Sequence, residues 1–156
     1  MAANLVSQST ATCGSSADFS ARCRVEFADT DMAGIAHFTN YFHYMERVEH
    51  EFLRACGLDV VLHDQRGAYG FPKRSVECDY FRPARHGAEL DASLRADWSD
   101  GKSIRYEIDF SCDGQLHARG RLQVACCRFP VGGDPFAIPL PDHVLSGLQR
   151  LAAGQE

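Results

Sequence analysis

The chain has 156 residues and a mass of 17.3 kDa, the size of a single domain with its own hydrophobic core. Hydrophobic residues make up 45% and charged residues 24%, which is typical of a soluble globular domain and excludes a disordered or fibrous chain. The net charge of −5 leaves no basic surplus for a phosphate backbone, so we expect no nucleic-acid partner. We also expect no membrane association, because the apolar stretches are far shorter than the ~20 residues that span a bilayer.

Seven cysteines are present, and none forms a C-x-x-C pair. The spacing gives no support for a zinc ribbon or a thioredoxin-type motif. Most of these cysteines fall on apolar faces, where a free thiol acts as a small hydrophobic group, so a reducing cytoplasm is the simplest setting. Residues 1–18 lack the basic and apolar regions of a signal peptide, and their composition predicts a flexible tail before one domain over residues 19–156.

The first regular element is a strand over residues 20–28, because apolar and charged side chains alternate there. Its apolar face holds Ala21, Cys23, Val25 and Phe27. Residues 29–37 fit neither the helical nor the strand period and predict a loop. A helix follows over residues 39–56, with an apolar stripe at helical spacing, a cap at Thr39 or Asn40, and Gly57 as its C-terminal stop.

Residues 58–66 predict a second short helix, and the Gly and Pro residues of 67–72 predict a loop. Alternation then predicts four more strands, over 76–80, 90–98, 104–112 and 116–126. Asp-Gly pairs at 100–101 and 113–114 are strong hairpin signals between the last three. A short helix is expected over 142–152. The fold class is therefore α+β, with one aromatic helix against the apolar face of a five-stranded antiparallel sheet.

Two carboxylates, Asp29 and Asp31, lie between the first strand and the long helix. The N–H groups at the start of that helix favour negative charge. A carboxylate that faces oriented N–H donors suits acyl transfer, which needs a base or nucleophile and an oxyanion site. The alternative is that both carboxylates only make turn bonds and cap the helix.

The segment V-E-F-A-D-T-D-M-A-G-I, followed by F-T-N-Y and a helix ending F-L-R-A-C-G-L, resembles the 4-hydroxybenzoyl-CoA thioesterase family of the hotdog superfamily. The resemblance runs from about residue 22 to residue 129 and includes F-R-P-A and G-K-S-I. It implies the hotdog fold, in which a five-stranded antiparallel sheet wraps around one long helix. It further implies a homodimer or homotetramer whose active sites are built at the interface.

The same resemblance places the catalytic role on Asp31, as the general base or the nucleophile of acyl-CoA thioester hydrolysis, and gives Asp29 a structural role. The carbonyl-polarising donor falls on the backbone N–H of Phe38. Many relatives have histidine at that position, whereas this chain has His37 one residue earlier, so a side-chain role for His37 stays open.

Substrate contacts are implied for six further positions, which are Gly34, Asn40, Tyr41, Glu46, Lys102 and Ser103. The substrate is an acyl-CoA or an acyl-carrier-protein thioester, and no cofactor is expected. His43, Glu46 and His50 share one helical face, but H-E-x-x-H is absent and we expect no metal. Ser99-Asp100-Gly101 precedes Lys102, so the phosphate-contacting basic cluster is thinner here than in some relatives.

Two other functions compete with hydrolysis. The first is a non-catalytic acyl-CoA-binding hotdog protein, against which Asp31 argues because a pure binder has little use for a carboxylate beside a thioester. The second is a hotdog enoyl-CoA hydratase, whose G-D-x-N-P-x-H signature is missing here. The acyl group, the choice of base or nucleophile, and dimer or tetramer remain open at this level.

Overall fold

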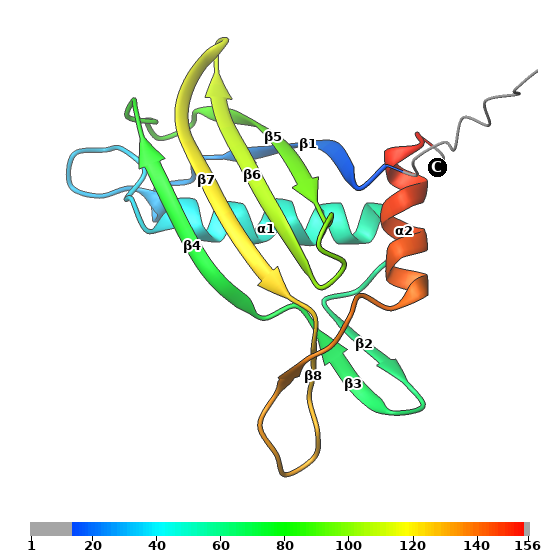
Figure 1. Ribbon diagram of the computed structural model, residues 1–156. Helices are drawn as coiled ribbons and strands as arrows, with labels where there is room; N and C mark the ends of the chain where they lie inside the picture. Colours follow the sequence, from blue (N-terminus) through cyan, green and yellow to red (C-terminus); the bar gives the residue numbers. More distant parts are fainter. Residues whose placement is uncertain (1–13, 155–156) are drawn as a thin grey trace, which may run out of the picture.

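The fold is α+β, as the sequence predicts, and is built on one large antiparallel sheet (Figure 1). The structure is a computed structural model that describes residues 14–154. The strand order of this sheet is β1-β5-β6-β7-β4, so β1 and β4 form its edges. The strands are β1 (Ser16–Arg24), β4 (Lys73–Tyr80), β5 (Glu89–Asp97), β6 (Ser103–Cys112) and β7 (Gln115–Ala125).

Both Asp-Gly pairs turn the chain between neighbouring strands, as predicted. Asp113 and Gly114 have φ values of 50° and 73°, so they form a tight two-residue turn between β6 and β7. Two consecutive positive φ values match the right-handed twist of a hairpin. On the outer face of the sheet, ion pairs such as Arg119–Asp109 and Arg121–Glu107 join neighbouring strands, while the inner side chains are apolar.

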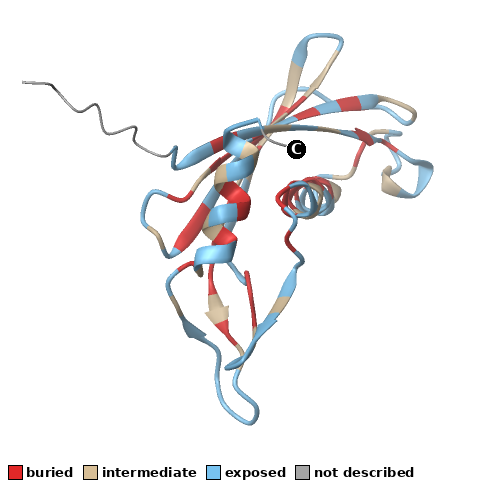
Figure 2. Cartoon of the chain, turned by 90° about the vertical axis from the view of Figure 1, so that its right-hand side faces the viewer, coloured by how far each residue is buried: buried red, intermediate tan, exposed pale blue. Residues whose placement is uncertain are grey.

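Helix α1 (Asn40–Ala55) lies against the inner face of the large sheet and is seen nearly end-on in Figure 2. Its stripe of buried side chains meets inward-facing residues of β5, β6 and β7. These helix residues are Tyr41, Tyr44, Met45, Val48, Glu49, Phe52 and Leu53. Gly57 follows with a φ of 73°, the left-handed conformation expected after a helix end.

The predicted capping of α1 is wrong in detail. Thr39 precedes the helix but makes no side-chain capping bond, because its hydroxyl pairs with the ring of His37 (Oγ1 to Nδ1, 2.7 Å). The Asn40 side chain instead donates to the carbonyl oxygen of Asp29 at 2.7 Å. The first turn of α1 is thus fastened to the preceding loop by side chains rather than capped by them.

A second, smaller sheet lies below the first in Figure 1 and was not expected from the sequence. Its order is β2-β3-β8-β9, with β2 (Val61–Asp64), β3 (Gly67–Gly70), β8 (Cys127–Arg128) and β9 (Phe136–Ala137). The predicted short helix over 58–66 and loop over 67–72 are therefore wrong. Residues 61–64 pair with 67–70 as a hairpin, and β8 pairs with β3, so long-range pairing overrides the local pattern.

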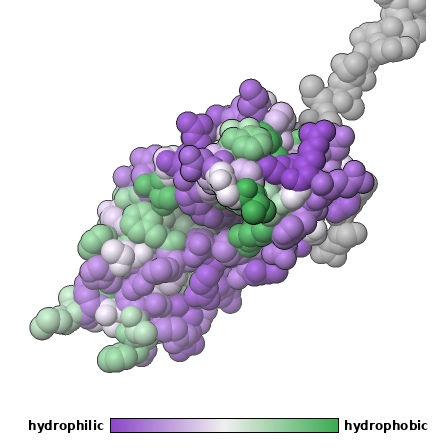
Figure 3. All heavy atoms as spheres, turned by 90° about the horizontal axis from the view of Figure 1, so that it is seen from below, coloured by the Kyte–Doolittle hydropathy of each residue, from purple (hydrophilic) through white to green (hydrophobic). Residues whose placement is uncertain are grey.

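The buried guanidinium of Arg128 fastens this small sheet. It donates to both carboxylate oxygens of Asp64, at 2.6 and 2.8 Å, and lies 5.1 Å from the ring centre of Tyr69. The arginine bonds lower the pKa of Asp64 to about 2. The underside of the molecule in Figure 3 shows apolar patches interrupted by hydrophilic atoms. Large apolar side chains exposed on the small sheet and its connections are Val60, Val61, Val131 and Phe136.

Helix α2 (Asp142–Ala152) occupies its predicted range and crosses the end of α1 (Figure 1). Gly147 permits the close approach, since a Cβ atom there would lie 2.6 Å from the carbonyl oxygen of Cys56. At the other end of the chain, the predicted tail through residue 18 is too long, because Ser16–Asp18 already pair with β5. The rest of that tail, residues 1–13, lies outside the described residues.

Several apolar residues that were expected to face the core are exposed instead, including Phe42 on α1 at 38%. Phe27 was expected on the inner face of the first strand, but β1 ends at Arg24 and Phe27 begins a short 3₁₀ helix (Phe27–Asp29) with its side chain 80% exposed. Val76 and Tyr80 alternate as predicted on β4, yet both remain more than a third exposed because β4 is an edge strand. None of the helices within residues 14–154 is long and apolar enough to cross a membrane.

Candidate active site

The loop between β1 and α1 is organised around Asp29. Its carboxylate Oδ2 accepts hydrogen bonds from the Glu26 N–H and the Tyr44 hydroxyl, both at 2.9 Å. Its carbonyl oxygen accepts from the His37 N–H at 2.8 Å and from the Asn40 side chain. Burial and the bond to Asp29 raise the pKa of Tyr44, so this hydroxyl stays a donor. These contacts are the kind that a structural role for Asp29 requires.

Asp31 is held differently, at the exposed end of the same loop. Its Oδ1 accepts one hydrogen bond, from the Ala33 N–H at 2.8 Å, and its Oδ2 accepts none within the described residues. The turn closes through the Asp31 N–H to the Ile35 carbonyl and the Gly34 N–H to the Asp31 carbonyl, at 3.0 and 2.9 Å. Gly34 has a φ of 71°, which disfavours other residues at this turn. One carboxylate oxygen therefore remains available for chemistry.

A groove of about 390 Å³ opens beside Asp31. Its walls come from the Asp31 loop, the start of α1, the end of β4 and the segment that follows β4. They are largely apolar, and Asp31 is the only carboxylate among them. The lining residues are Asp31, Ile35, Ala36, Phe38, Tyr41, Tyr80, Phe81, Arg82, Pro83 and Ala84. The Ala36 N–H donates to the Ala84 carbonyl at 2.7 Å and joins the two sides.

The backbone N–H of Phe38 has no acceptor within residues 14–154, whereas the neighbouring amides do. The His37 N–H is bonded to Asp29, and the Asn40 N–H is bonded to the His37 carbonyl at 2.9 Å. The Phe38 carbonyl is fixed by the Tyr80 hydroxyl at 2.9 Å. The groove therefore combines a partly free carboxylate with an unpaired N–H at the start of α1. Such an N–H is a ready donor for developing negative charge.

The His37 ring is half-buried and bonded to Thr39, and it lies against the Phe38 ring with 4.5 Å between the ring centres. It does not line the Asp31 groove. Tyr41 does, stacked edge-on against Tyr80 at 5.4 Å. Burial raises the pKa of both phenols to about 12, so they are neutral near pH 7.

The remaining substrate-binding candidates lie elsewhere. The Asn40 side chain is bonded to Asp29 rather than directed at the groove. Glu46 lines a second hollow between α1 and β4, together with Phe42, His43 and Lys73. Within residues 14–154 no group of three histidine, cysteine or acidic side chains is placed to hold a metal. Lys102 and Ser103 lie in the β5–β6 hairpin and do not line either hollow.

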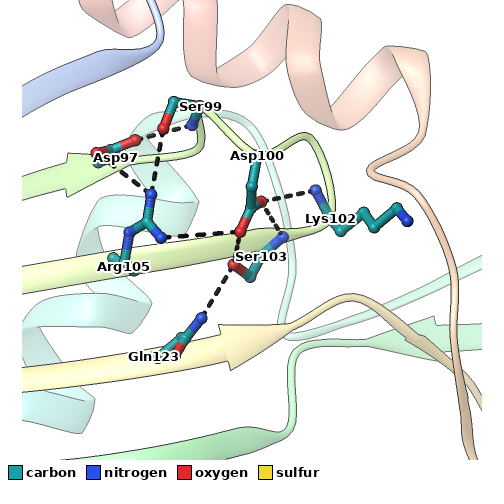
Figure 4. Close-up of polar contacts among 7 residues, drawn as sticks. All are labelled: Asp97, Ser99, Asp100, Lys102, Ser103, Arg105 and Gln123. Atoms are coloured by element: carbon teal, nitrogen blue, oxygen red, sulfur yellow. Dashed lines mark hydrogen bonds and ion pairs between the residues drawn. The ribbon is translucent and has the colours of Figure 1, made fainter.

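Asp100 organises that hairpin, as Figure 4 shows. Its carboxylate accepts from the backbone N–H groups of Lys102 and Ser103, at 2.9 and 2.7 Å, and from the Ser103 hydroxyl. These bonds, led by that of the hydroxyl, lower the pKa of Asp100 to about 2. Both donors of Ser103 are thus committed to Asp100, and Arg105 lies between Asp97 and Asp100. Among the residues drawn in Figure 4, the Lys102 side chain makes no ion pair and extends away from Asp100.

Two features near α1 and β4 were not predicted from the sequence. The segment after β4 lines the Asp31 groove, although the F-R-P-A motif had marked its place in the chain. The second is a buried ion pair, in which Lys73 Nζ lies 2.5 Å from Glu49 Oε2. Burial raises the pKa of Glu49, and Lys73 opposes that rise. An acidic residue inside the apolar stripe of α1 was the available signal.

Comparison with known proteins supports a single family. A family model described as the thioesterase-like superfamily matches residues 25–148, which is most of the chain. An acyl-CoA thioesterase, YbgC, of Helicobacter pylori is 37% identical over 70 residues, which are 45% of this chain and 50% of that protein. The chain thus spans about half the length of this relative. A 1,4-dihydroxy-2-naphthoyl-CoA hydrolase of Synechococcus is 26% identical over 80% of this chain and 96% of its own.

Solved structures resemble the whole fold. A 1,4-dihydroxy-2-naphthoyl-CoA thioesterase from Synechocystis superposes with a TM-score of 0.73 at 23% identity, covering 84% of this chain and 95% of its own. A gentisyl-coenzyme A thioesterase superposes with a TM-score of 0.69 at 25% identity, covering 81% and 99%. The architecture is therefore that of hotdog thioesterases, and the Asp31 loop lies within the matched residues.

Proposed function

The chain belongs to the thioesterase-like superfamily, and we propose that it hydrolyses an acyl-CoA thioester to a free carboxylic acid and CoA. The observation that carries this proposal is the groove in which Asp31, with one carboxylate oxygen free, and the unpaired N–H of Phe38 lie among apolar side chains. The names of the relatives support the same reaction class. We place the protein in the cytoplasm and assign it no cofactor.

The reaction requires few catalytic groups. A thiol with an ordinary pKa near ~8.5 leaves readily as thiolate, so no strong general acid is needed. As a general base, Asp31 takes a proton from water while the hydroxide adds to the carbonyl carbon and the carbonyl oxygen takes up the negative charge. The C–S bond then breaks and the thiolate gains a proton. As a nucleophile, Asp31 adds to the carbonyl carbon, and the C–S bond breaks to release the thiolate and leave a mixed anhydride. Water then cleaves this anhydride, which gives the free acid and restores the Asp31 carboxylate.

The Phe38 N–H is our proposed oxyanion donor in either route, because a backbone donor does not depend on the phenylalanine side chain. His37 is bonded to Thr39 beside this donor, so we assign it the orientation of the helix start rather than a proton-transfer role. Gly34 shapes the turn, and Tyr41 contacts the acyl group as part of the groove wall. The thioester is carried by CoA or by an acyl carrier protein, and substrates of both kinds belong in the assay.

We further propose that the functional unit is at least a homodimer. β4 is an edge strand, and side chains on and beside it are exposed and apolar, including Val76, Tyr80 and Phe81 at 41, 45 and 52%. Exposed edges are normally paired or covered, and a second copy would close the open groove. Light scattering at micromolar concentration should give a dimer or a tetramer. A monomer that still hydrolyses thioesters would contradict the proposal.

The test of catalysis is a pair of substitutions in one loop. Asp31→Asn should lower turnover by about 10²–10⁴-fold while the fold and ligand binding survive, because size and much of the hydrogen bonding are retained. Asp29→Asn should act mainly on stability, by about 1–3 kcal/mol, because its carboxylate holds Glu26 and Tyr44. Thiol release from a panel of acyl-CoA, aryl-CoA and carrier-protein thioesters measures turnover, and thermal unfolding measures stability.

A non-catalytic acyl-CoA-binding protein is the competing function. It has an unpaired N–H and an apolar groove in common with an enzyme, but it gives no role to the free oxygen of Asp31. Binding of a non-hydrolysable thioether analogue separates the two functions. If the analogue binds while the wild type and Asp31→Asn release thiol at the same background rate, the hydrolase proposal fails and the binding function replaces it.

A further inference from the structure

A buried polar cluster lies inside the core beside the middle of α1. It consists of Glu49 on α1, Lys73 at the start of β4 and Tyr106 on β6, and is called here the Glu49 cluster. Glu49 is 0% exposed and Tyr106 is 2% exposed, whereas the Lys73 side chain is 31% exposed. The Tyr106 ring packs edge-on against the Phe52 ring, with 5.7 Å between the ring centres, and Phe52 lies one helical turn after Glu49 on the buried stripe of α1, so Tyr106 faces the part of the helix that carries Glu49.

Two polar atoms of this cluster have no hydrogen-bond partner among the described residues. Lys73 Nζ is 2.5 Å from Glu49 Oε2 and pairs with that oxygen, whereas Glu49 Oε1 has no hydrogen-bond partner within residues 14–154. The Tyr106 hydroxyl has no partner there either. Buried polar groups are nearly always hydrogen-bonded, and leaving them unpaired is costly. The two unpartnered oxygens, Glu49 Oε1 and the Tyr106 hydroxyl, indicate a site for a ligand atom.

The Glu49 cluster adjoins a hollow that a ligand can enter. This hollow of about 420 Å³ lies between α1 and β4 and is lined by Phe42, His43, Met45, Glu46, Lys73, Val76 and Leu122. Its walls are mostly apolar, and Lys73 belongs both to its lining and to the cluster. The Lys73 side chain is 31% exposed, so a movement of its ammonium group is the step by which we expect a ligand in the hollow to reach Glu49.

This hollow and the Asp31 groove lie along the same α1–β4 junction. Val76 of the hollow and Tyr80 of the groove are four residues apart on β4 and so point to the same face of the sheet. Tyr41 of the groove and Glu49 are eight residues apart on α1, a rise of about 12 Å. An acyl chain of medium length whose thioester lies at Asp31, and which runs along this junction, would therefore end near the Glu49 cluster.

We propose that the Glu49 cluster recognises a hydroxyl group at the far end of the acyl chain, with the hydroxyl donating to the Glu49 carboxylate and accepting from the Tyr106 hydroxyl. The proposal rests on the proposed thioesterase function, because it takes Asp31 as the position of the thioester. Lys73 already neutralises Glu49, so the cluster suits an uncharged hydroxyl better than a terminal carboxylate or amine. Glu49 and Tyr106 are then residues that determine acyl specificity.

The experiment compares decanoyl-CoA with ω-hydroxydecanoyl-CoA, two thioesters that differ only at the far end. The wild type should prefer the hydroxylated substrate by about ten- to one-hundredfold in kcat/KM, the value of a hydrogen bond to a charged group. Tyr106→Phe and Glu49→Gln should reduce that ratio to a few-fold. Glu51→Gln is the matched control on the same helix. Glu51 makes no ion pair within the described part of the chain, so its variant should keep the full ratio.

Thioether analogues of the two substrates, measured by calorimetry, report recognition without turnover. If the enzyme hydrolyses both thioesters at equal kcat/KM, or if Tyr106→Phe and Glu49→Gln keep the wild-type ratio, the inference is overturned while the thioesterase function stands. If no thioester is hydrolysed but the hydroxylated thioether binds more tightly and the preference is lost in Tyr106→Phe, the thioesterase function fails and the recognition site stands. Where a variant unfolds, the other variant and the wild-type ratio decide.

Discussion

Replacing Lys73 with methionine should destabilise the protein in a pH-dependent way, because it leaves the Glu49 carboxylate alone in the core. Removing one partner of a buried ion pair typically costs about 3–5 kcal/mol. Glu49 can limit this loss by taking up a proton, which at pH 7 costs a carboxyl of ordinary pKa about 3.7 kcal/mol. Because the Lys73 side chain is 31% exposed in the wild type, we expect a loss of about 2–3 kcal/mol at pH 7.

The sign of the pH dependence follows from the direction of the Glu49 shift. Burial raises the pKa of Glu49 in the folded state, and Lys73 counters part of that rise. A carboxyl with a raised folded pKa favours the folded state at low pH, and this contribution is lost as pH rises through the folded pKa. Without Lys73 the rise is larger. The deficit of Lys73→Met should therefore shrink to about 1 kcal/mol or less at pH 5, where protonation costs little.

Urea unfolding at pH 5 and pH 7, at one protein concentration, measures this difference. Trp98 is the only tryptophan and is buried, so its fluorescence reports unfolding. Lys102→Met is the matched control, because Lys102 is exposed and has no ion pair within residues 14–154. The double variant with Glu49→Gln should regain most of the lost stability. An equal deficit at both pH values, or a Lys73→Met loss no larger than that of the control, would refute the argument.

Three further outcomes follow from packing and hydrogen bonding. Gly120→Ala should lower the thermal midpoint by the equivalent of about 1–3 kcal/mol, since the new Cβ would lie 2.0 Å from Met45 Sδ; an unchanged midpoint would contradict this packing. Cys23 should resist thiol reagents at pH 8 in the native state, because burial raises its pKa to about 11, and should react only after unfolding. Tyr44→Phe should lower the free energy of unfolding by about 1–3 kcal/mol and should also lower turnover, because it removes the 2.9 Å hydrogen bond to Asp29. Unchanged urea unfolding and unchanged thiol release would argue against this role of Tyr44.

The large sheet and both helices were predictable because their apolar residues repeat with a clear period. The alternation over 104–112 and 116–126, for example, corresponds to β6 and β7 within one or two residues. The helix predicted over residues 58–66 was wrong for a physical reason. Its few apolar residues form a short run that fits a helix or a strand, and only pairing with β3 made residues 61–64 a strand. Local sequence carries no information about that partner.

In the candidate site, too, some features were predictable from the sequence and others were not. The D-T-D-x-x-G segment marked the Asp31 loop, and the different contacts of Asp29 and Asp31 agree with the roles that the resemblance implied. The resemblance also pointed to Ser103, but it could not reveal that Asp100 takes up both of that residue's donors. That arrangement depends on side chains bonding within one turn, which an aspartate before a serine allows but does not require.

Glu49 shows how a departure from a pattern can carry more information than the pattern. It lies four residues after Met45 and three before Phe52, so helical spacing alone puts it on the buried stripe of α1. An apolar residue there would stabilise the core at least as well as the Glu49–Lys73 pair, because desolvating a buried pair offsets its attraction. The charged pair therefore weakens a helix whose other buried positions serve packing. Departures of this kind are expected where a residue serves binding rather than stability, and the unpartnered Oε1 of Glu49 supports the binding role that we propose for it.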